Sequence, residues 1–147
     1  MDMRFSIVDY GSDAYEACVV LREDILRRPL GLVLTPEERA MDVNAVHVAG
    51  ILSDDTLPVV ATLCLLPQGA GKVKMRQVAV HADMQGKNLG GRMMDFCDNW
   101  AQDNGYSYIF CHARAAARKF YERHGYRVEG TAFDEQGIPH FYMYKNI

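Results

Sequence analysis

The stretch Gln85–Arg92, QGKNLGGR, lies between the apolar run VKMRQVAV and the segment MMDFCDNW, whose apolar residues recur at helical spacing. Its three glycines let a backbone approach a ligand closely, and the first amides of a helix favour negative charge. Lys87 and Arg92 add positive charge to the same stretch. We therefore predict a strand, an anion-binding loop and a helix in succession.

Composition limits what the ligand can be. The chain has 147 residues, near the usual size of one domain, so we expect a single domain over 1–147. Its net charge of −3 and the lack of a lysine-arginine block argue against a nucleic-acid partner. No apolar run approaches the roughly 20 residues of a membrane span, and the amino-terminal stretch MDMRFSIVDY does not resemble a signal peptide. We expect a cytoplasmic protein with a small ligand and no membrane contact.

The four cysteines are widely spaced and form no CxxC motif. They are Cys18, Cys64, Cys97 and Cys111. This spacing gives little support to a disulfide framework or a zinc site. We expect buried free thiols and no metal.

Periodicity and turn residues predict the order of elements. Strands are expected over Arg4–Val8, Asn44–Leu52, Leu57–Leu66, Lys72–Val80, YSYIFCH (106–112), YRVEG (126–130) and HFYMYK (140–145), with turns at SDDT, PQGAG and FDEQGIP. Helices are expected over Asp13–Leu26, at the capping signal Thr35–Glu38, from Leu89 to a stop at 103–105, and over Ala115–His124. A strand-helix-strand unit normally makes a right-handed parallel crossover, so an α/β (α+β) fold with a mixed sheet is predicted.

Two motifs carry a resemblance to a known family. The segment RQVAVHADMQGKNLGGRMM resembles the acyl-CoA-binding motif of the GNAT superfamily of N-acetyltransferases, and ARKFYERHGYRVEG resembles the helix and strand that follow it. The segment CHARAAARKFYERHGYRVEGTAFDEQGIPHFYMYK is similar to the ElaA-like branch, including its GIPH. The resemblance implies a mixed, mostly antiparallel central sheet flanked by helices, with acetyl-CoA as co-substrate. Asn88 stands where the family usually has glycine, and asparagine tolerates a left-handed backbone best after glycine.

The resemblance also implies how this chain would bind coenzyme A. Amides at the helix start would hold the pyrophosphate, and the backbone of the preceding strand would pair with the pantetheine arm. The residues implied are Val78, Val80, Gln85, Gly86, Lys87, Asn88, Gly90, Gly91 and Arg92. The alternative is a tight turn whose glycines serve packing, beside an ordinary strand pair.

Acetyl transfer to an amine makes two chemical demands. An alkyl ammonium with a pKa of about 10.4 must lose its proton, which costs roughly 4.6 kcal/mol at pH 7, and the leaving thiolate benefits from a proton donor. Tyr121 occupies the family's tyrosine position and is the expected proton donor. Alternatively, Tyr121 is a half-buried tyrosine with a structural role only. No glutamate lies within Lys72–Val80, so His112 and His140 are the candidates for the base, although each could equally be structural.

Other polar residues near these positions are weaker candidates. Arg114 could bind an acidic group of the substrate or cap a helix, whereas Arg76 and Glu135 are more often a solvated charge and a hairpin acid. His81 and His124 are expected at the surface.

Two functions remain open at this point. The first is an enzyme that moves an acetyl group from acetyl-CoA to a primary amine of a small molecule or peptide. The second is a non-catalytic acyl-CoA-binding sensor or interaction module. The sequence does not identify the acceptor. Specificity for it would come from the first helix, Pro29–Met41 and the hairpin around Gly137. A homodimer paired through edge strands is a further expectation from the family.

Overall fold

The computed structural model of the protein describes residues 3–52 and 59–147. Its strands are β1 Met3–Val8, β2 Val46–Leu52, β3 Val59–Gly69, β4 Lys72–Val80, β5 Tyr108–Arg114, β6 Arg127–Glu135 and β7 Ile138–Asn146. Its α-helices are α1 Asp13–Arg22, α2 Pro36–Met41, α3 Leu89–Asp103 and α4 Arg118–Arg123. The predicted turn SDDT and the first two residues of the predicted strand Leu57–Leu66 lie outside the described residues.

All seven strands form one sheet in the order β1-β2-β3-β4-β5-β7-β6. Only β4 and β5 pair in parallel, and the other neighbours are antiparallel. The mixed, mostly antiparallel α/β sheet expected from the sequence is therefore confirmed. Because strands from both ends of the described chain join this sheet, we propose that they form one domain.

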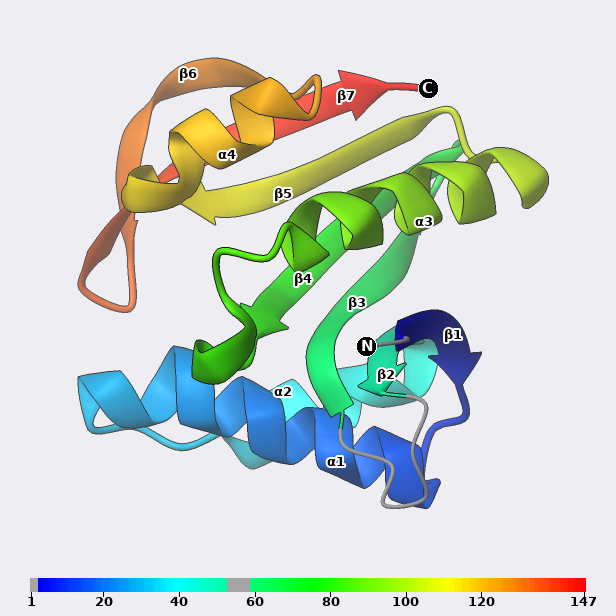
Figure 1. Ribbon diagram of the computed structural model, residues 1–147. Helices are drawn as coiled ribbons and strands as arrows, with labels where there is room; N and C mark the ends of the chain where they lie inside the picture. The colour runs from blue at the N-terminus through cyan, green and yellow to red at the C-terminus, as the bar shows by residue number, and fades with distance from the viewer. Residues whose placement is uncertain (1–2, 53–58) are drawn as a thin grey trace.

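Helices cover both faces of the sheet, because neighbouring residues of a strand point to opposite faces. Val48 of β2 packs in the core that includes Met93 and Cys97 of α3, whereas the next residue, Ala49, packs with Cys18 of α1. Figure 1 shows α3 and α4 in front of β4 and β5, with α1 and α2 at the lower edge of the view.

The closing hairpin is longer than the sequence predicted. We expected strands over 126–130 and 140–145 around a loop, FDEQGIP, but β6 runs to Glu135 and β7 starts at Ile138. The turn consists of Gln136 and Gly137 alone, with φ of 56° and 75°. Two consecutive positive φ angles match the right-handed twist of a hairpin, so the strands continue up to the turn. The predicted loop was wrong, because most of it is strand.

Two helices are also interrupted. The predicted helix Asp13–Leu26 is α1 followed by a π-helical turn, Glu23–Arg27, and Ala115–His124 is a 3-10 turn, Ala115–Ala117, followed by α4. A single 3-10 turn, Ala82–Met84, also precedes the loop that leads into α3.

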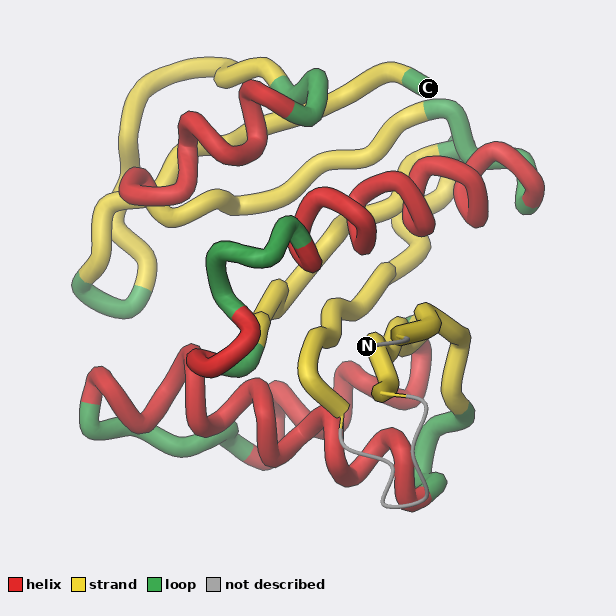
Figure 2. The backbone as a smooth tube through the Cα atoms, in the orientation of Figure 1, coloured by secondary structure: helices red, strands yellow, loops and turns green. Residues whose placement is uncertain are grey.

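The two parallel strands separate after four residue pairs. Lys72–Met75 pairs with Tyr108–Cys111, and beyond these residues β4 and β5 diverge, as the chain trace shows (Figure 2). The β3–β4 register passes from Cys64↔Arg76 to Thr62↔Ala79, so two residues of β4, Gln77 and Val78, lie opposite one of β3. This is a β-bulge, and Gln77 has a φ of 56° within it. The second half of β4 therefore has no strand neighbour on its β5 side.

A buried ion pair supports this bulge from α1. Arg22 and Asp42 are both fully buried, with the Arg22 Nη1 donating to Asp42 Oδ2 over 2.8 Å. The Tyr15 hydroxyl donates to the same oxygen over 2.6 Å. Arg22 Nε donates to the side-chain oxygen of Gln77. The bulged residue is thus tied by its side chain to the helical layer.

All four cysteines are free and buried, as the sequence predicted. One group of metal-ligating side chains, Asp42, His47 and Cys64, has its ligand atoms within 4.8 Å of one another among the described residues. Asp42 already accepts from Arg22, and His47 Nε2 lies 2.8 Å from the Asp42 carbonyl oxygen. The neighbouring guanidinium disfavours a second cation there. None of the helices in the described residues has the length and apolar character that a membrane crossing requires.

Candidate active site

The loop before α3 adopts the conformation expected from its sequence. Asn88 precedes the helix with φ 60° and ψ 25°, so it occupies the left-handed region that was predicted for it. Its side chain makes no capping hydrogen bond, and the first turn of α3 carries no acidic residue. Backbone amides at the start of a 15-residue helix are therefore free to donate, and the helix dipole favours an anion beside them.

These amides face a cavity of about 530 Å³, which we call the loop cavity. This volume lies within the usual range of small-ligand sites. The cavity is bounded by the second half of β4, the loop, the start of α3 and the helix α4. Its lining residues include Val78, Val80, Gln85, Gly86, Asn88, Gly90, Gly91, Phe120, Tyr121, Arg123 and His124.

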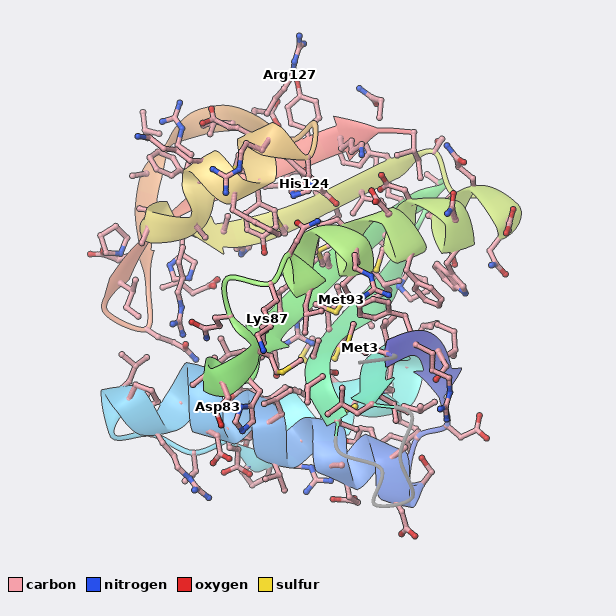
Figure 3. The ribbon with its side chains drawn as sticks, in the orientation of Figure 1. Met3, Asp83, Lys87, Met93, His124 and Arg127 are labelled. Carbon is pink, nitrogen blue, oxygen red and sulfur yellow. The ribbon has the colours of Figure 1, made fainter. Side chains whose placement is uncertain are left out.

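Seven of the nine predicted binding residues line this cavity, whereas the two basic residues do not. Arg92 donates from Nη2 to the carbonyl of Met3 over 3.3 Å, and its guanidinium lies over the ring of Phe5. It is therefore directed toward β1. Lys87 is exposed on the loop in Figure 3.

The basic side chains that do line the loop cavity come from α4 and the residue that follows it. Arg123 is exposed, and His124 is half-buried against the ring of Phe120. Figure 3 labels His124 beside the start of α3. His124, expected at the surface, is thus only half-exposed, and Arg123 is a lining residue that the sequence did not single out. The motif YERHGY contained both residues, but only the packing of α4 against α3 directs them to this cavity.

A second cavity, of about 260 Å³, adjoins the first along β4, and we call it the histidine cavity. It lies between the end of α1, β4, β5 and the β6–β7 hairpin. Its lining residues include Leu26, Arg27, Glu38, Lys74, Arg76, His112, Arg114, Glu135 and His140. Val78, Ala117 and Tyr121 line both cavities, so the two meet where β4 and β5 separate.

The sheet register brings both predicted histidines to one carboxylate. His140 is opposite Arg114 on β5 and opposite Phe133 on β6, two residues before Glu135. His112 Nδ1 lies 2.9 Å from Glu135 Oε1, and His140 Nε2 lies 3.6 Å from Glu135 Oε2. The first is a hydrogen bond and the second is too long for one. Glu135, which the sequence presented only as a hairpin acid, is the centre of this group.

The hydrogen bonds assign different chemistry to the two rings. A carboxylate accepts, so His112 donates from Nδ1 and its Nε2 is left with a lone pair. His140 Nδ1 lies 2.8 Å from the carbonyl oxygen of Ile138 and donates to it. His112 is half-buried, whereas His140 is buried. Burial raises the pKa of Glu135. The hydrogen bond from His112 and the electrostatic effect of the neighbouring basic side chains outweigh burial, so the pKa of Glu135 is lowered overall.

Tyr121 lies at the junction of the two cavities. It is 6% exposed, and its hydroxyl makes no hydrogen bond among the described residues. Burial raises its pKa far above the ordinary value, and the neighbouring Cys111 and Cys97 raise it further. The phenol therefore keeps its proton and can donate a hydrogen bond into the junction.

The site thus has free amides at one end, a histidine-carboxylate pair at the other and a protonated phenol between them. This arrangement can hold an anionic carrier in one cavity and a nucleophile in the other, with a proton acceptor and a proton donor on the lining.

Comparison with known proteins found a matching family model and a curated relative. The family model described as "Acetyltransferase (GNAT) domain" matches residues 55–147, which is more than half of the chain. A curated relative, the uncharacterised N-acetyltransferase YjcF of Bacillus subtilis, is 28% identical over 127 residues, covering 86% of this chain and 88% of that protein.

Two solved structures show the likeness of the fold. The crystal structure of Escherichia coli ElaA superposes with a TM-score of 0.82 at 17% identity, covering 98% of this chain and 99% of that one. An acetyltransferase of the same family from Elizabethkingia anophelis, solved with acetyl-CoA bound, gives a TM-score of 0.74 at 12% identity over 99% and 98% of the chains.

Proposed function

The chain belongs to the GNAT acetyltransferase family, and from that premise we propose that it transfers an acetyl group from acetyl-CoA to a primary amine by direct attack. The acceptor is a small molecule or peptide, and we propose a cytoplasmic location. The observation that carries the proposal is the meeting of the loop cavity and the histidine cavity at Val78, Ala117 and Tyr121.

The loop cavity supports binding of the coenzyme. The amides at the start of α3 would hold the pyrophosphate, and Arg123 supplies a cation on the same lining. Beyond Met75 the backbone of β4 has no partner on β5, so its amides and carbonyls are free to pair with the pantetheine arm. This directs the thioester toward the bulge, where the Val78 amide is proposed to stabilise the carbonyl oxygen as it gains charge.

The histidine cavity supports activation of the amine. His112 Nε2 is proposed as the base, with Glu135 orienting the ring through its 2.9 Å hydrogen bond and stabilising the imidazolium. The amine nitrogen forms a bond to the acetyl carbon as its proton passes to His112. His140, which donates from Nδ1 to the Ile138 carbonyl and also lines the cavity, is the second candidate for the base.

Tyr121 is proposed to serve the leaving group. As the carbon–sulfur bond breaks, the sulfur gains negative charge, and the Tyr121 hydroxyl donates a hydrogen bond or its proton to it. Because its pKa is raised, this buried phenol keeps its proton, which favours a hydrogen bond to the sulfur over full transfer of the proton.

One experiment tests the function itself. The purified protein is incubated with acetyl-CoA and a panel of primary amines while free thiol is followed, and acetyl-CoA binding is measured by calorimetry. Thiol release that depends on an amine supports the transferase. Tight binding without thiol release across the panel would instead support the acyl-CoA sensor, and an absence of binding would refute both.

Gly91→Ala is expected to weaken acetyl-CoA binding by about tenfold, since overpacking typically costs roughly 1–3 kcal/mol. A Cβ at this position would lie 2.4 Å from Asn88 Oδ1 and 3.0 Å from His124 Cε1, so these two side chains, both of which line the loop cavity, must shift. Alanine favours helix more than glycine does, so intrinsic helix propensity cannot explain a loss. The control is Asn99→Ala on the exposed face of α3. Equal dissociation constants for both variants in calorimetry would contradict the assignment.

His112→Gln is expected to lower kcat by about 10²-fold at pH 7, near the lower end of general-base contributions, because water can partly replace a half-buried base. The loss should shrink as pH approaches the amine pKa of about 10.4, since the acceptor then loses its proton without help. The measurement is kcat from pH 7 to 10, with His81→Gln, an exposed histidine, as control. A loss independent of pH would refute the role as base.

A further inference from the structure

The histidine cavity carries more positive than negative side chains. Arg27, Lys74, Arg76 and Arg114 line it, against two carboxylates, Glu38 and Glu135. Both carboxylates are already engaged, Glu38 in an ion pair with Arg27 and Glu135 with the two histidines. Within the described residues, Lys74, Arg76 and Arg114 have no carboxylate partner. The cavity is therefore lined by two more positive than negative side chains.

Arg76 supplies the most specific of these observations. Its Nη1 is buried and has no hydrogen-bond partner among the described residues. A buried N–H without an acceptor costs free energy, and a charged donor costs more than a neutral one. Arg76 precedes the bulge of β4 directly, so it lies beside the place where the two cavities meet. An acceptor atom from a ligand would relieve this cost.

Lys74 and Arg114 surround the same space. Lys74 lies two residues before Arg76 on β4 and so shares its face of the sheet. Burial lowers the pKa of Lys74, and the charge of Arg76 lowers it further. Arg114 Nη2 donates to the carbonyl of Leu26 over 3.0 Å, which leaves other guanidinium donors of its five free.

The phosphates of the coenzyme do not account for these cations. The proposed phosphate site lies in the loop cavity, at the start of α3 and beside Arg123. The part of the coenzyme that reaches the junction is an uncharged thioester. An anion in the histidine cavity must therefore come from the second substrate.

We propose that the acceptor carries an acidic group, a carboxylate or a phosphate, which Arg76 binds together with Lys74 and Arg114 while the amine faces His112. This rests on the proposed function, since it assigns the acceptor to the histidine cavity. A volume of about 260 Å³ suits a molecule of amino-acid size better than a folded protein segment. Arginine and lysine side chains here would repel a polycationic acceptor.

Matched pairs of acceptors test the proposal. Amino acids are compared with their amides, and an aminoalkyl phosphate with the corresponding amino alcohol, by kcat/KM from thiol release. Each acid is expected to exceed its neutral partner by about 10–100-fold, the usual effect of a hydrogen bond to a charged group. The amine of an amino-acid amide is less basic than that of the amino acid, so a larger fraction of it is unprotonated and able to attack near neutral pH. A preference for the acid therefore cannot arise from the amine. The pair with the larger ratio of acid to neutral kcat/KM shows whether the acidic group of the acceptor is a carboxylate or a phosphate.

Variants assign the preference to the cavity. Arg76→Met should reduce the ratio to about one by lowering the rate with the acid and not with the neutral partner. Arg127→Met is the matched control, because Arg127 is exposed and points away from the molecule in Figure 3. Should Arg76→Met fail to fold, as judged by thermal unfolding, Lys74→Met replaces it. Equal rates with acids and neutral partners, or an equal loss on both in the variant, would overturn the proposal.

A binding measurement separates this inference from the proposed function. N-acetyl amino acids and their amides are titrated into the protein saturated with coenzyme A, by calorimetry. If no amine is acetylated but the N-acetyl acid binds and Arg76→Met abolishes its binding, the anion site stands and the transferase fails. If amines are acetylated but the acids show no advantage in binding or turnover, the transferase stands and the anion site fails.

Discussion

Tyr121→Phe is expected to lower kcat by about 10²–10⁴-fold while leaving the dissociation constant of acetyl-CoA nearly unchanged. The substitution removes one hydroxyl from a ring that is 6% exposed and keeps the packing of the ring. The lost hydroxyl is the proposed donor to the departing sulfur. The measurements are kcat from thiol release and binding by calorimetry.

Tyr126→Phe is the matched control for this variant. Tyr126 is 3% exposed, its ring centroid lies 5.5 Å from that of Tyr121, and it lines neither cavity. Its hydroxyl is buried without a partner among the described residues, so removing it should leave kcat unchanged. Similar kcat losses in both variants would show that Tyr121 acts through packing. An unchanged kcat in Tyr121→Phe would remove the proton donor from the mechanism.

Asp42→Ala is expected to destabilise the fold by about 3–5 kcal/mol, because it leaves the fully buried Arg22 without its counterion. Tyr15 loses its acceptor in the same change. The free energy of unfolding in urea measures the effect. Asp24→Ala is the control. Asp24 forms an exposed ion pair with Arg28, and such a pair should contribute less than about 1 kcal/mol to the free energy of unfolding.

The double variant Arg22→Met/Asp42→Leu should recover much of the stability, because neither charge is then left alone in the core. It also removes the hydrogen bond from Arg22 to Gln77 at the bulge. We therefore expect the double variant to fold but to have a lower kcat than the wild type. Full activity would show that the bulge does not need this support.

The contribution of Asp42 should also depend on pH. Burial raises the pKa of Asp42, but the hydrogen bonds from Arg22 and Tyr15 outweigh it, so the folded pKa is lowered. A lowered folded pKa gives stability that is present above the unfolded value of about 3.9 and is lost as pH falls through the folded one. The stability difference between wild type and Asp42→Ala should therefore shrink below about pH 4.

The positions of several site residues followed from local sequence. The loop before α3 was predictable because glycine and asparagine adopt positive φ most readily, and Asn88 does so at 60°. The strand before it and the amphipathic helix after it follow from hydrophobic periodicity, which depends on neighbours in sequence. Gly86, Gly90 and Gly91 therefore lie where the sequence predicted them.

Contacts across the sheet could not be predicted in this way. The His112–Glu135 hydrogen bond joins residues 23 apart, and it depends on the β5–β7 and β6–β7 registers. The register depends in turn on a two-residue turn at Gln136 and Gly137, which the sequence analysis assigned to a longer loop. A longer loop would not have fixed the position of Glu135 relative to His112.

Sequence by itself therefore determined the family, the order of elements and the loop before α3, because backbone conformation and periodicity are local properties. Tertiary structure alone decided that Arg92 contacts β1, that Arg22 and Asp42 share the core, and that Lys74, Arg76 and Arg114 surround one cavity. A charged residue has the same local pattern whether it is solvated or buried beside a partner. Only the packing of distant segments distinguishes the two.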